Sequence, residues 1–113
     1  MIRSAAAHDP WRNLRKVDRD EVDFSTTMRR PGGRDIDARV VNISTHGFMI
    51  RAEGAFQPGD PLHITLPVVG EVMAKVAWAL GGRLGGQFTT PIDQPRYAEL
   101  LKKAYRPRMS WPA

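Results

Sequence analysis

Two short groups of residues in this chain have the types and spacing that suit a phosphorylated nucleotide. The first is Arg15-Lys16-Val17-Asp18-Arg19, in which two arginines stand four positions apart, and the second is Asn42-Ile43-Ser44-Thr45-His46-Gly47, of the form Asn-x-Ser-x-x-Gly. Arginine presents a planar fork of donors that fits phosphate oxygens and the O6/N7 edge of guanine. Asn pairs with the edge of a base, Ser adds a hydroxyl, and Gly allows a tight turn or a close backbone approach. Together these residue types suit a guanine nucleotide better than a plain anion.

The elements that must position these groups are short strands. Apolar and polar residues alternate with the two-residue period of a strand, and Gly- and Pro-rich turns separate the runs. The predicted strands cover residues 21–28, 36–42, 46–51, 62–66, 72–78 and 84–88. This alternation favours the core for Trp78, with the rim of a ligand site as the alternative, and allows Asn42 to continue the inward face of its strand. Six short strands favour closure into a small barrel, because closure removes exposed edges.

After Pro91 the apolar period changes to three and four residues, which predicts an amphipathic helix over residues 94–105. Asp93 is the expected N-cap and Pro107 ends the helix. We expect this helix to cover one open side of the barrel.

Length and composition agree with one compact domain. The chain has 113 residues, of which 42% are apolar and 26% charged, and it lacks cysteine. Disulfides and thiolate metal sites are therefore excluded. No apolar stretch reaches the ~20 residues that a membrane helix needs, and no signal-peptide core is present. We expect a cytoplasmic protein without a membrane span.

The net charge of +5 is concentrated at the two ends of the chain, in residues 1–19 and 94–113. A basic end attracts phosphates of any kind, although a solvated surface that keeps the protein soluble has the same composition. A second Arg-x-x-x-Arg group, Arg30 to Arg34, spans a predicted turn at residues 31–33 and is interpreted as surface charge beside a hairpin.

Enzyme chemistry finds little support in the sequence. The histidines are scattered at positions 8, 46 and 63, without the spacing of metal ligands. There is no nucleophile elbow and no P-loop. The glycine-rich run Gly81 to Gly86 lies between two predicted strands, which indicates a hairpin turn rather than a phosphate loop. We expect no catalysis, no metal and no cofactor.

The order of the two motifs makes the sequence resemble the PilZ family of cyclic di-GMP receptors. That family has Arg-x-x-x-Arg before a six-stranded barrel and Asp/Asn-x-Ser-x-x-Gly about twenty to thirty residues later. Arg19 and Asn42 are 23 positions apart, whereas Arg34 stands only 8 positions before Asn42. Three later segments add to the resemblance: Phe56-x-Pro58-Gly59-Asp60-x-Leu62, Val76-x-Trp78 and Gly85-Gly86-Gln87-Phe88.

The resemblance implies a mainly β fold: a six-stranded antiparallel PilZ-type barrel, similar to a split barrel, with a C-terminal helix and a flexible basic N-terminal arm. It divides the chain into an arm over residues 1–14, a PilZ domain over 15–106 and a tail over 107–113. Within the domain, the barrel covers residues 20–90 and the helix covers 94–105.

The resemblance also implies the ligand contacts. Arg15 and Arg19 would hold phosphates and guanine edges, and Lys16 would add charge. Asn42 and Ser44 would contact a guanine base, and Gly47 would shape the turn. Further candidates are Trp11, Arg12, Leu14 and Gly85. Leu14 stands where an additional arginine would favour a stacked ligand pair, so we expect one cyclic di-GMP per domain.

The resemblance implies a receptor whose basic arm wraps over the barrel when cyclic di-GMP binds and so regulates an effector protein that the sequence does not identify. Such domains act on motility, exopolysaccharide production or virulence. Two alternatives remain open. One is a PilZ-like interaction module that does not bind the ligand, and the other is a small basic barrel for single-stranded nucleic acid. The aromatic residues offer no stacking surface, so we expect no nucleic-acid partner.

Overall fold

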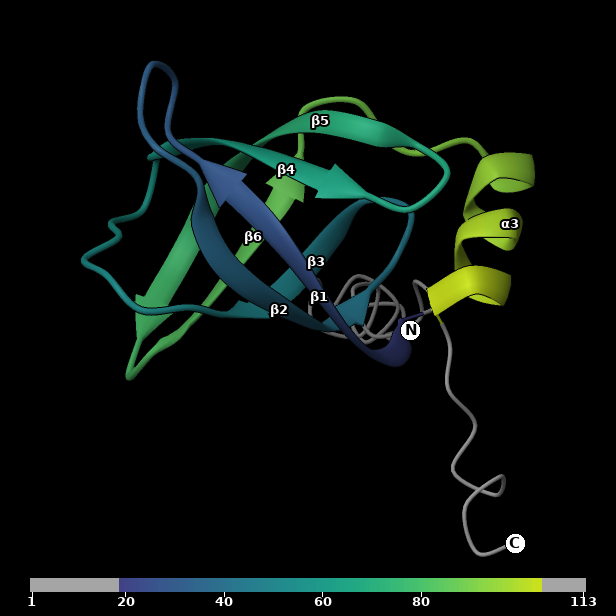
Figure 1. Ribbon diagram of the computed structural model, residues 1–113, viewed down its shortest axis with the longest axis horizontal. Coiled ribbons are helices and arrows are strands. Elements are labelled where there is room, and N and C mark those ends of the chain that lie inside the picture. Colours follow the sequence, from purple (N-terminus) through teal and green to yellow (C-terminus); the bar gives the residue numbers. More distant parts are fainter. Residues whose placement is uncertain (1–18, 105–113) are drawn as a thin grey trace, which may run out of the picture.

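A computed structural model describes residues 19–104 of the chain. Six antiparallel strands form a closed barrel with a helix at one end (Figure 1). In chain order these elements are β1 (Asp20–Arg29), β2 (Ile36–Ile43), β3 (Gly47–Arg51), β4 (Pro61–Leu66), β5 (Gly70–Leu80), β6 (Arg83–Phe88) and α3 (Gln94–Ala104). The order around the barrel is β1-β2-β3-β6-β5-β4, and pairing of β1 with β4 closes it. The predicted six-stranded antiparallel barrel is confirmed.

Apolar side chains fill the inside of the barrel. Val40, Ile43, Ile50 and Ile64 have no exposed surface, and Leu84 is almost as buried. These residues come from strands of five to eight residues, in which buried and exposed positions alternate except at a bulge. A barrel with so few strands has no room for a ligand beside its own side chains. A nucleotide must therefore bind on the outside or at an end.

Three irregularities in strand pairing decide which face each side chain occupies. They lie between Glu21 and Phe24 in β1, between Val40 and Asn42 in β2, and between Val76 and Trp78 in β5. An extra residue in one strand reverses the in-and-out alternation beyond it. In β2 the result is that Ile43 enters the core, so the expectation that Asn42 continues the inward face is wrong.

The same effect in β5 turns Trp78 outward. Its side chain is 40% exposed, so the prediction that it packs in the core is also wrong. Val76 is the last residue of β5 that faces inward before the shift in pairing between Val76 and Trp78. A strict two-residue alternation predicted that Trp78 faces inward, because such a pattern does not allow for a bulge.

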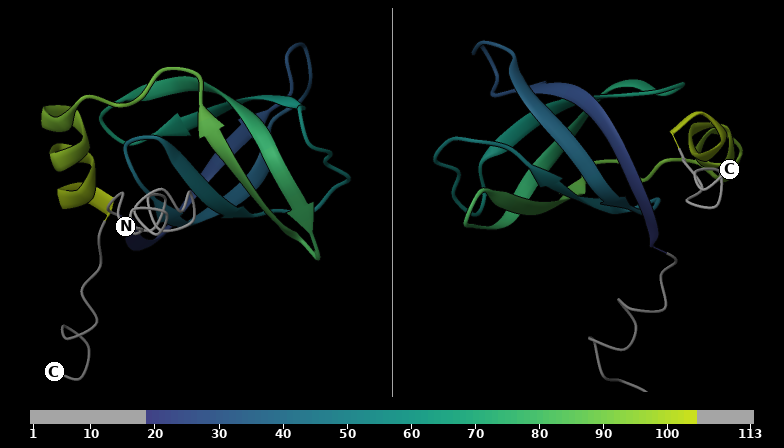
Figure 2. Two further views of the ribbon diagram at one scale, coloured as in Figure 1. Left: turned by 180° about the vertical axis from the view of Figure 1, so that it is seen from behind. Right: turned by 60° about the horizontal axis from the view of Figure 1, so that its bottom comes forward.

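Helix α3 covers the end of the barrel at which β1 begins (Figures 1 and 2). Asp93 caps it, since its Oδ1 accepts a hydrogen bond from the Arg96 amide at 2.9 Å. The buried side of the helix consists of Tyr97, Leu100 and Ala104. The described helix ends at Ala104; the predicted end at residues 105–107 lies outside the described residues. Within residues 19–104, no helix has the length and apolar character of a membrane span.

Tyr97 ties the helix to the barrel. Its hydroxyl donates to the carboxylate of Asp20, the first residue of β1, and lies 3.0 Å from the carbonyl oxygen of Ile43, the last residue of β2. Asp20 and Ile43 are themselves cross-strand partners. One side chain of α3 therefore holds together the start of β1 and the end of β2, which are the segments that carry the two sequence motifs.

Candidate ligand-binding site

Strand pairing brings the end of the first motif next to the second. In the β1–β2 ladder, Asp20 pairs with Ile43 and Glu21 pairs with Asn42. Arg19 directly precedes this ladder and is exposed. It makes no hydrogen bond or ion pair with the other residues of the described range. Its guanidinium is therefore available to a ligand at the edge where Asn42 lies.

Ser44 and Gly47 shape the loop that follows Asn42. Ser44 is only 4% exposed, and its Oγ accepts hydrogen bonds from the amides of His46 and Gly47, both at 3.1 Å. The Ser44 amide in turn donates to the Gly47 carbonyl at 2.9 Å. These bonds are a side-chain mimic of a backbone turn. They explain the Ser-x-x-Gly part of the motif as a rigid loop between β2 and β3, whereas contact of Ser44 with a base stays a prediction.

Gly47 is required by close packing of strands. A Cβ at this position would stand 2.5 Å from the carbonyl oxygen of Gly86 in the neighbouring strand β6. The loop is also tied to the end of β6, because the His46 carbonyl accepts from the Phe88 amide at 2.8 Å. The backbone beside Asn42 is thus fixed from both sides.

A row of outward-facing residues crosses four strands from Asn42. Asn42 pairs with Met49, Met49 with Gly85, and Gly85 with Trp78. A Cβ at Gly85 would overlap the indole of Trp78, so the ring lies over this glycine on the outside of the barrel. We call these four residues the Asn42–Trp78 row. It offers an amide at one end, an indole at the other and apolar surface between them.

The described part of the predicted site is therefore contiguous. Arg19, Asn42 and Gly47 lie at one end of the barrel around the Ser44 loop, and Gly85 lies in the row that begins at Asn42. The remaining predicted residues, Trp11, Arg12, Leu14, Arg15 and Lys16, are outside the described residues.

Sequence reasoning did not include Met49 among the site residues, and it assigned Trp78 chiefly to the core, with the ligand rim as the rival reading. A signal for Trp78 was present, because two consecutive glycines inside a strand indicate that another group approaches the backbone closely. Here that group is the indole on Gly85. Met49 has no comparable signal in the sequence, because its place in the row depends on the bulge in β2.

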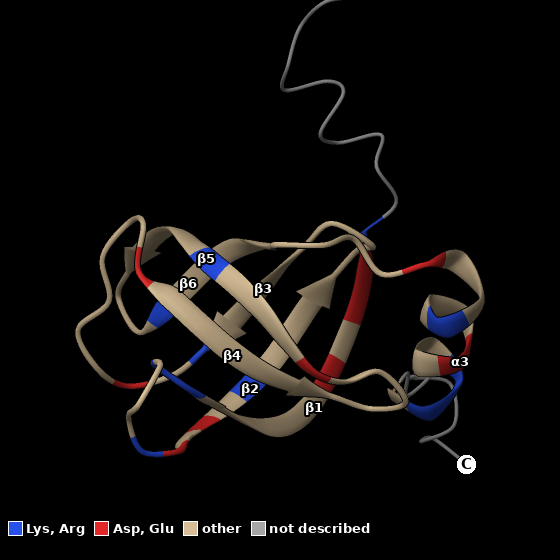
Figure 3. Ribbon diagram, turned by 90° about the horizontal axis from the view of Figure 1, so that it is seen from above, with Lys and Arg blue, Asp and Glu red and all other residues tan. Residues whose placement is uncertain are grey.

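The described residues at this end of the barrel carry charges of both signs. The first residues of β1 include the acidic Asp20, Glu21 and Asp23, and Figure 3 marks acidic positions of this strand in red. An anion bound at this end would be repelled by these carboxylates and attracted by Arg19. Residues 1–19 contain five Arg or Lys. In residues 19–104, no group of three His, Asp or Glu residues is placed to hold a metal ion.

The closed six-stranded barrel with its C-terminal helix agrees with the fold that the resemblance to the PilZ class implies. The family model of the PilZ domain matches residues 13–105. The chain therefore belongs to the PilZ domain family, whose members are cyclic di-GMP receptors and adaptors rather than enzymes. The match includes both Arg15 and Arg19. No curated protein matches the chain significantly.

Proposed function

We propose that this chain is a cyclic di-GMP receptor that acts as an adaptor without catalysis of its own. The observation that carries the proposal is the register of β1 and β2, in which Asn42 pairs with Glu21, two residues after Arg19, in a chain of the PilZ family. Cyclic di-GMP has two negative charges and two guanines. It therefore needs arginine guanidinium groups and side chains that hydrogen-bond to the edge of a guanine close together. This end of the barrel supplies both kinds of group.

The ligand lies on the outside of the barrel in this proposal. Arg15 and Arg19 bind phosphates and guanine edges, Lys16 adds charge, and Asn42 pairs with one guanine. The indole of Trp78 extends the surface on which a flat base can pack. Charge-assisted hydrogen bonds contribute about 1.5–3 kcal/mol each. Two arginines and one or two base contacts give binding of about −8 kcal/mol, which is about micromolar, after ordering costs.

Ligand binding orders the segment that contains Arg15, and this ordering is the proposed signal. Residues 8–19 wrap over the barrel and create or hide a surface for an effector protein in the cytoplasm. The outputs that we propose are those of single-domain receptors of this type: motility, exopolysaccharide production or virulence.

Calorimetric titration of cyclic di-GMP into the full chain tests the receptor proposal, with GMP and cyclic AMP as control ligands. We expect one cyclic di-GMP per chain at micromolar affinity, and loss of at least about tenfold in Arg15→Ala and in Arg19→Ala. Arg34→Ala is the matched control, because it removes an exposed arginine with the same spacing at the other end of β1. Its affinity should equal that of the unmodified chain.

Two results would contradict the proposal. Absence of heat and of any thermal shift at ~100 micromolar ligand, a concentration that saturates a micromolar site, would identify an interaction module that does not bind the nucleotide. Equal losses in Arg19→Ala and Arg34→Ala would show attraction to net charge alone. Amide exchange in residues 8–19 tests the arm separately, since unchanged exchange at saturating ligand would remove the ordering step.

A further inference from the structure

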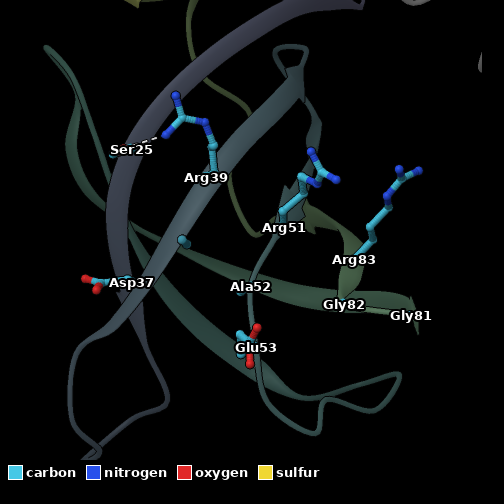
Figure 4. Close-up of a pocket in the computed structure, with 10 residues that line it drawn as sticks. Ser25, Asp37, Arg39, Arg51, Ala52, Glu53, Gly81, Gly82 and Arg83 are labelled. Carbon is cyan, nitrogen blue, oxygen red and sulfur yellow. Dashed lines mark hydrogen bonds between the residues drawn. The ribbon is translucent and has the colours of Figure 1, made fainter.

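Three arginines stand side by side on the outer surface, on neighbouring strands. Arg39 of β2 pairs with Arg51 of β3, and Arg51 pairs with Arg83 of β6. All three line one hollow of about 540 Å³. Figure 4 shows the three side chains rising on the same side of the sheet. We call these three residues the arginine row.

The arginine row is electrostatically unfavourable as the chain stands. Like charges on directly opposite residues of neighbouring strands destabilise a sheet. Arg39 is compensated, because it forms an ion pair with Asp23 and donates to Ser25 Oγ at 2.9 Å. Arg51 and Arg83 are exposed and have no hydrogen bond or ion pair within the described range. An anionic group placed between them would relieve the repulsion that the fold leaves uncompensated.

The arginine row is distinct from the Asn42–Trp78 row but lies next to it. Arg51 is two residues beyond Met49 on the same face of β3, and Arg83 is two residues before Gly85 on the same face of β6. Two residues along a strand correspond to about 7 Å. The inference therefore goes beyond the proposed nucleotide site and does not depend on it.

The surroundings of the arginine row favour a protein partner over a nucleic acid. Asp37 and Glu53 line the same hollow, so three positive charges face two negative ones. A nucleic-acid strand binds by placing many phosphates against cations and would meet both carboxylates. A protein segment, in contrast, can place one or two carboxylates against the arginines and none against Asp37 and Glu53.

The end of the row adds an apolar contact. Leu80 of β5 pairs with Arg83 and is 79% exposed, the most exposed large apolar residue of the described range. Arginine is enriched at protein–protein interfaces, and an exposed apolar side chain beside it adds surface that a partner can bury.

We propose that the arginine row and Leu80 dock an extended acidic segment of a partner protein. Alternate residues of such a segment point to the same side about 7 Å apart, so carboxylates at alternate positions reach Arg51 and Arg83. Arginine forks bind carboxylates with two parallel hydrogen bonds. An apolar side chain next to the carboxylates packs on Leu80.

Fluorescence anisotropy with the full chain and no cyclic di-GMP tests this surface. The probe is a short labelled peptide in which Glu alternates with Ala and one Leu follows. We expect saturable binding that weakens with salt, and that Arg83→Glu weakens at least about tenfold. Arg34→Glu makes the same charge change away from the row and should leave affinity within about twofold, the scale of an exposed, screened charge. Leu80→Ser should weaken binding several-fold, and Met73→Ser, another exposed apolar residue, should not.

Each other outcome overturns the proposal. If no binding is detected at a peptide concentration of ~1 mM, which corresponds to a very weak dissociation constant, the docking surface is removed. Equal losses in Arg83→Glu and Arg34→Glu reduce the effect to net charge. Tighter binding of single-stranded oligothymidylate of matched charge, with the same dependence on Arg83, assigns the row to nucleic acid. Loss of cyclic di-GMP binding in a folded Arg83→Glu assigns it to the nucleotide site. Because the peptide experiment omits the nucleotide, failure of the receptor proposal leaves its result unchanged.

Discussion

Arg19 and Arg30 stand at the two ends of β1, and each belongs to a pair of arginines four positions apart. Arg30 is fully engaged by the loop between β3 and β4. It donates to the carbonyl of Ala55, lies 4.6 Å from the ring centre of Phe56 and approaches Asp60 at 3.8 Å. Arg19 has no comparable partner in residues 19–104.

The two ends of β1 therefore differ in what their arginines do. Arg30 stabilises a loop of its own barrel, while Arg19, two residues before the partner of Asn42, has no ion pair within the described part of the chain. The interpretation of the second pair as hairpin-flanking charge agrees with this placement. An Arg-x-x-x-Arg spacing does not by itself indicate a phosphate site; the residues that the fold brings next to it decide.

The largest difference between the two ends concerns their glycines. Gly47→Ala places a methyl group 2.5 Å from the Gly86 carbonyl, so β3 and β6 must separate next to the Ser44 loop. We expect a loss of about 2–3 kcal/mol in the free energy of unfolding, as for other overpacked sites. Gly32→Ala, at the Arg30 end, meets no atom within 4 Å and suffers only from its positive φ of 76°, at about 1 kcal/mol. Denaturant titration of both variants compares them, and equal losses would contradict this assignment.

Tyr97→Phe tests how firmly the Arg19 end is held. The variant loses the hydroxyl that donates to Asp20 and lies 3.0 Å from the Ile43 carbonyl oxygen. We expect a cost of about 1–2 kcal/mol in unfolding free energy. Slower amide exchange, or unchanged exchange, at the start of β1 in the variant would show that Tyr97 does not hold this end.

Arg30→Ala separates stability from binding. We expect it to lower the free energy of unfolding by about 1 kcal/mol, because an exposed ion pair, a hydrogen bond and a ring contact are each weak. For a domain of this size the melting temperature falls by about 4–8 °C. Cyclic di-GMP affinity stays unchanged. Arg19→Ala should show the reverse pattern, and a variant that changed both properties would remove the contrast between the two ends.

The smallest expected effect is at Trp78. Trp78→Ala removes an indole that is partly exposed over Gly85 and should weaken cyclic di-GMP binding about threefold to tenfold, the range for one packed aromatic contact. Calorimetry measures the affinity, and circular dichroism checks that the barrel is intact. Unchanged affinity in a folded variant would confine the ligand to the Asn42 end of the row.

Several features could be predicted from local sequence because local physics decides them. Alternating residues predicted all six strands to within a few positions, and the change of period after Pro91 predicted α3 with Asp93 as its cap. The Gly81-Gly82 pair predicted a hairpin turn, and both residues have the positive φ that such a turn needs. The interval between Arg19 and Asn42 predicted the family.

Tertiary structure decided which side chains share a surface. The bulges in β2 and β5 reverse the faces of the residues beyond them, which brings Asn42 and Trp78 to the outside in one row. The arginine row likewise exists only through the registers of β2 with β3 and of β3 with β6. A bulge or register depends on the partner strand, whose contacts are distant in the chain. The sequence by itself therefore determined the elements, the motifs and the family, while pairing between distant strands determined the surfaces that they form.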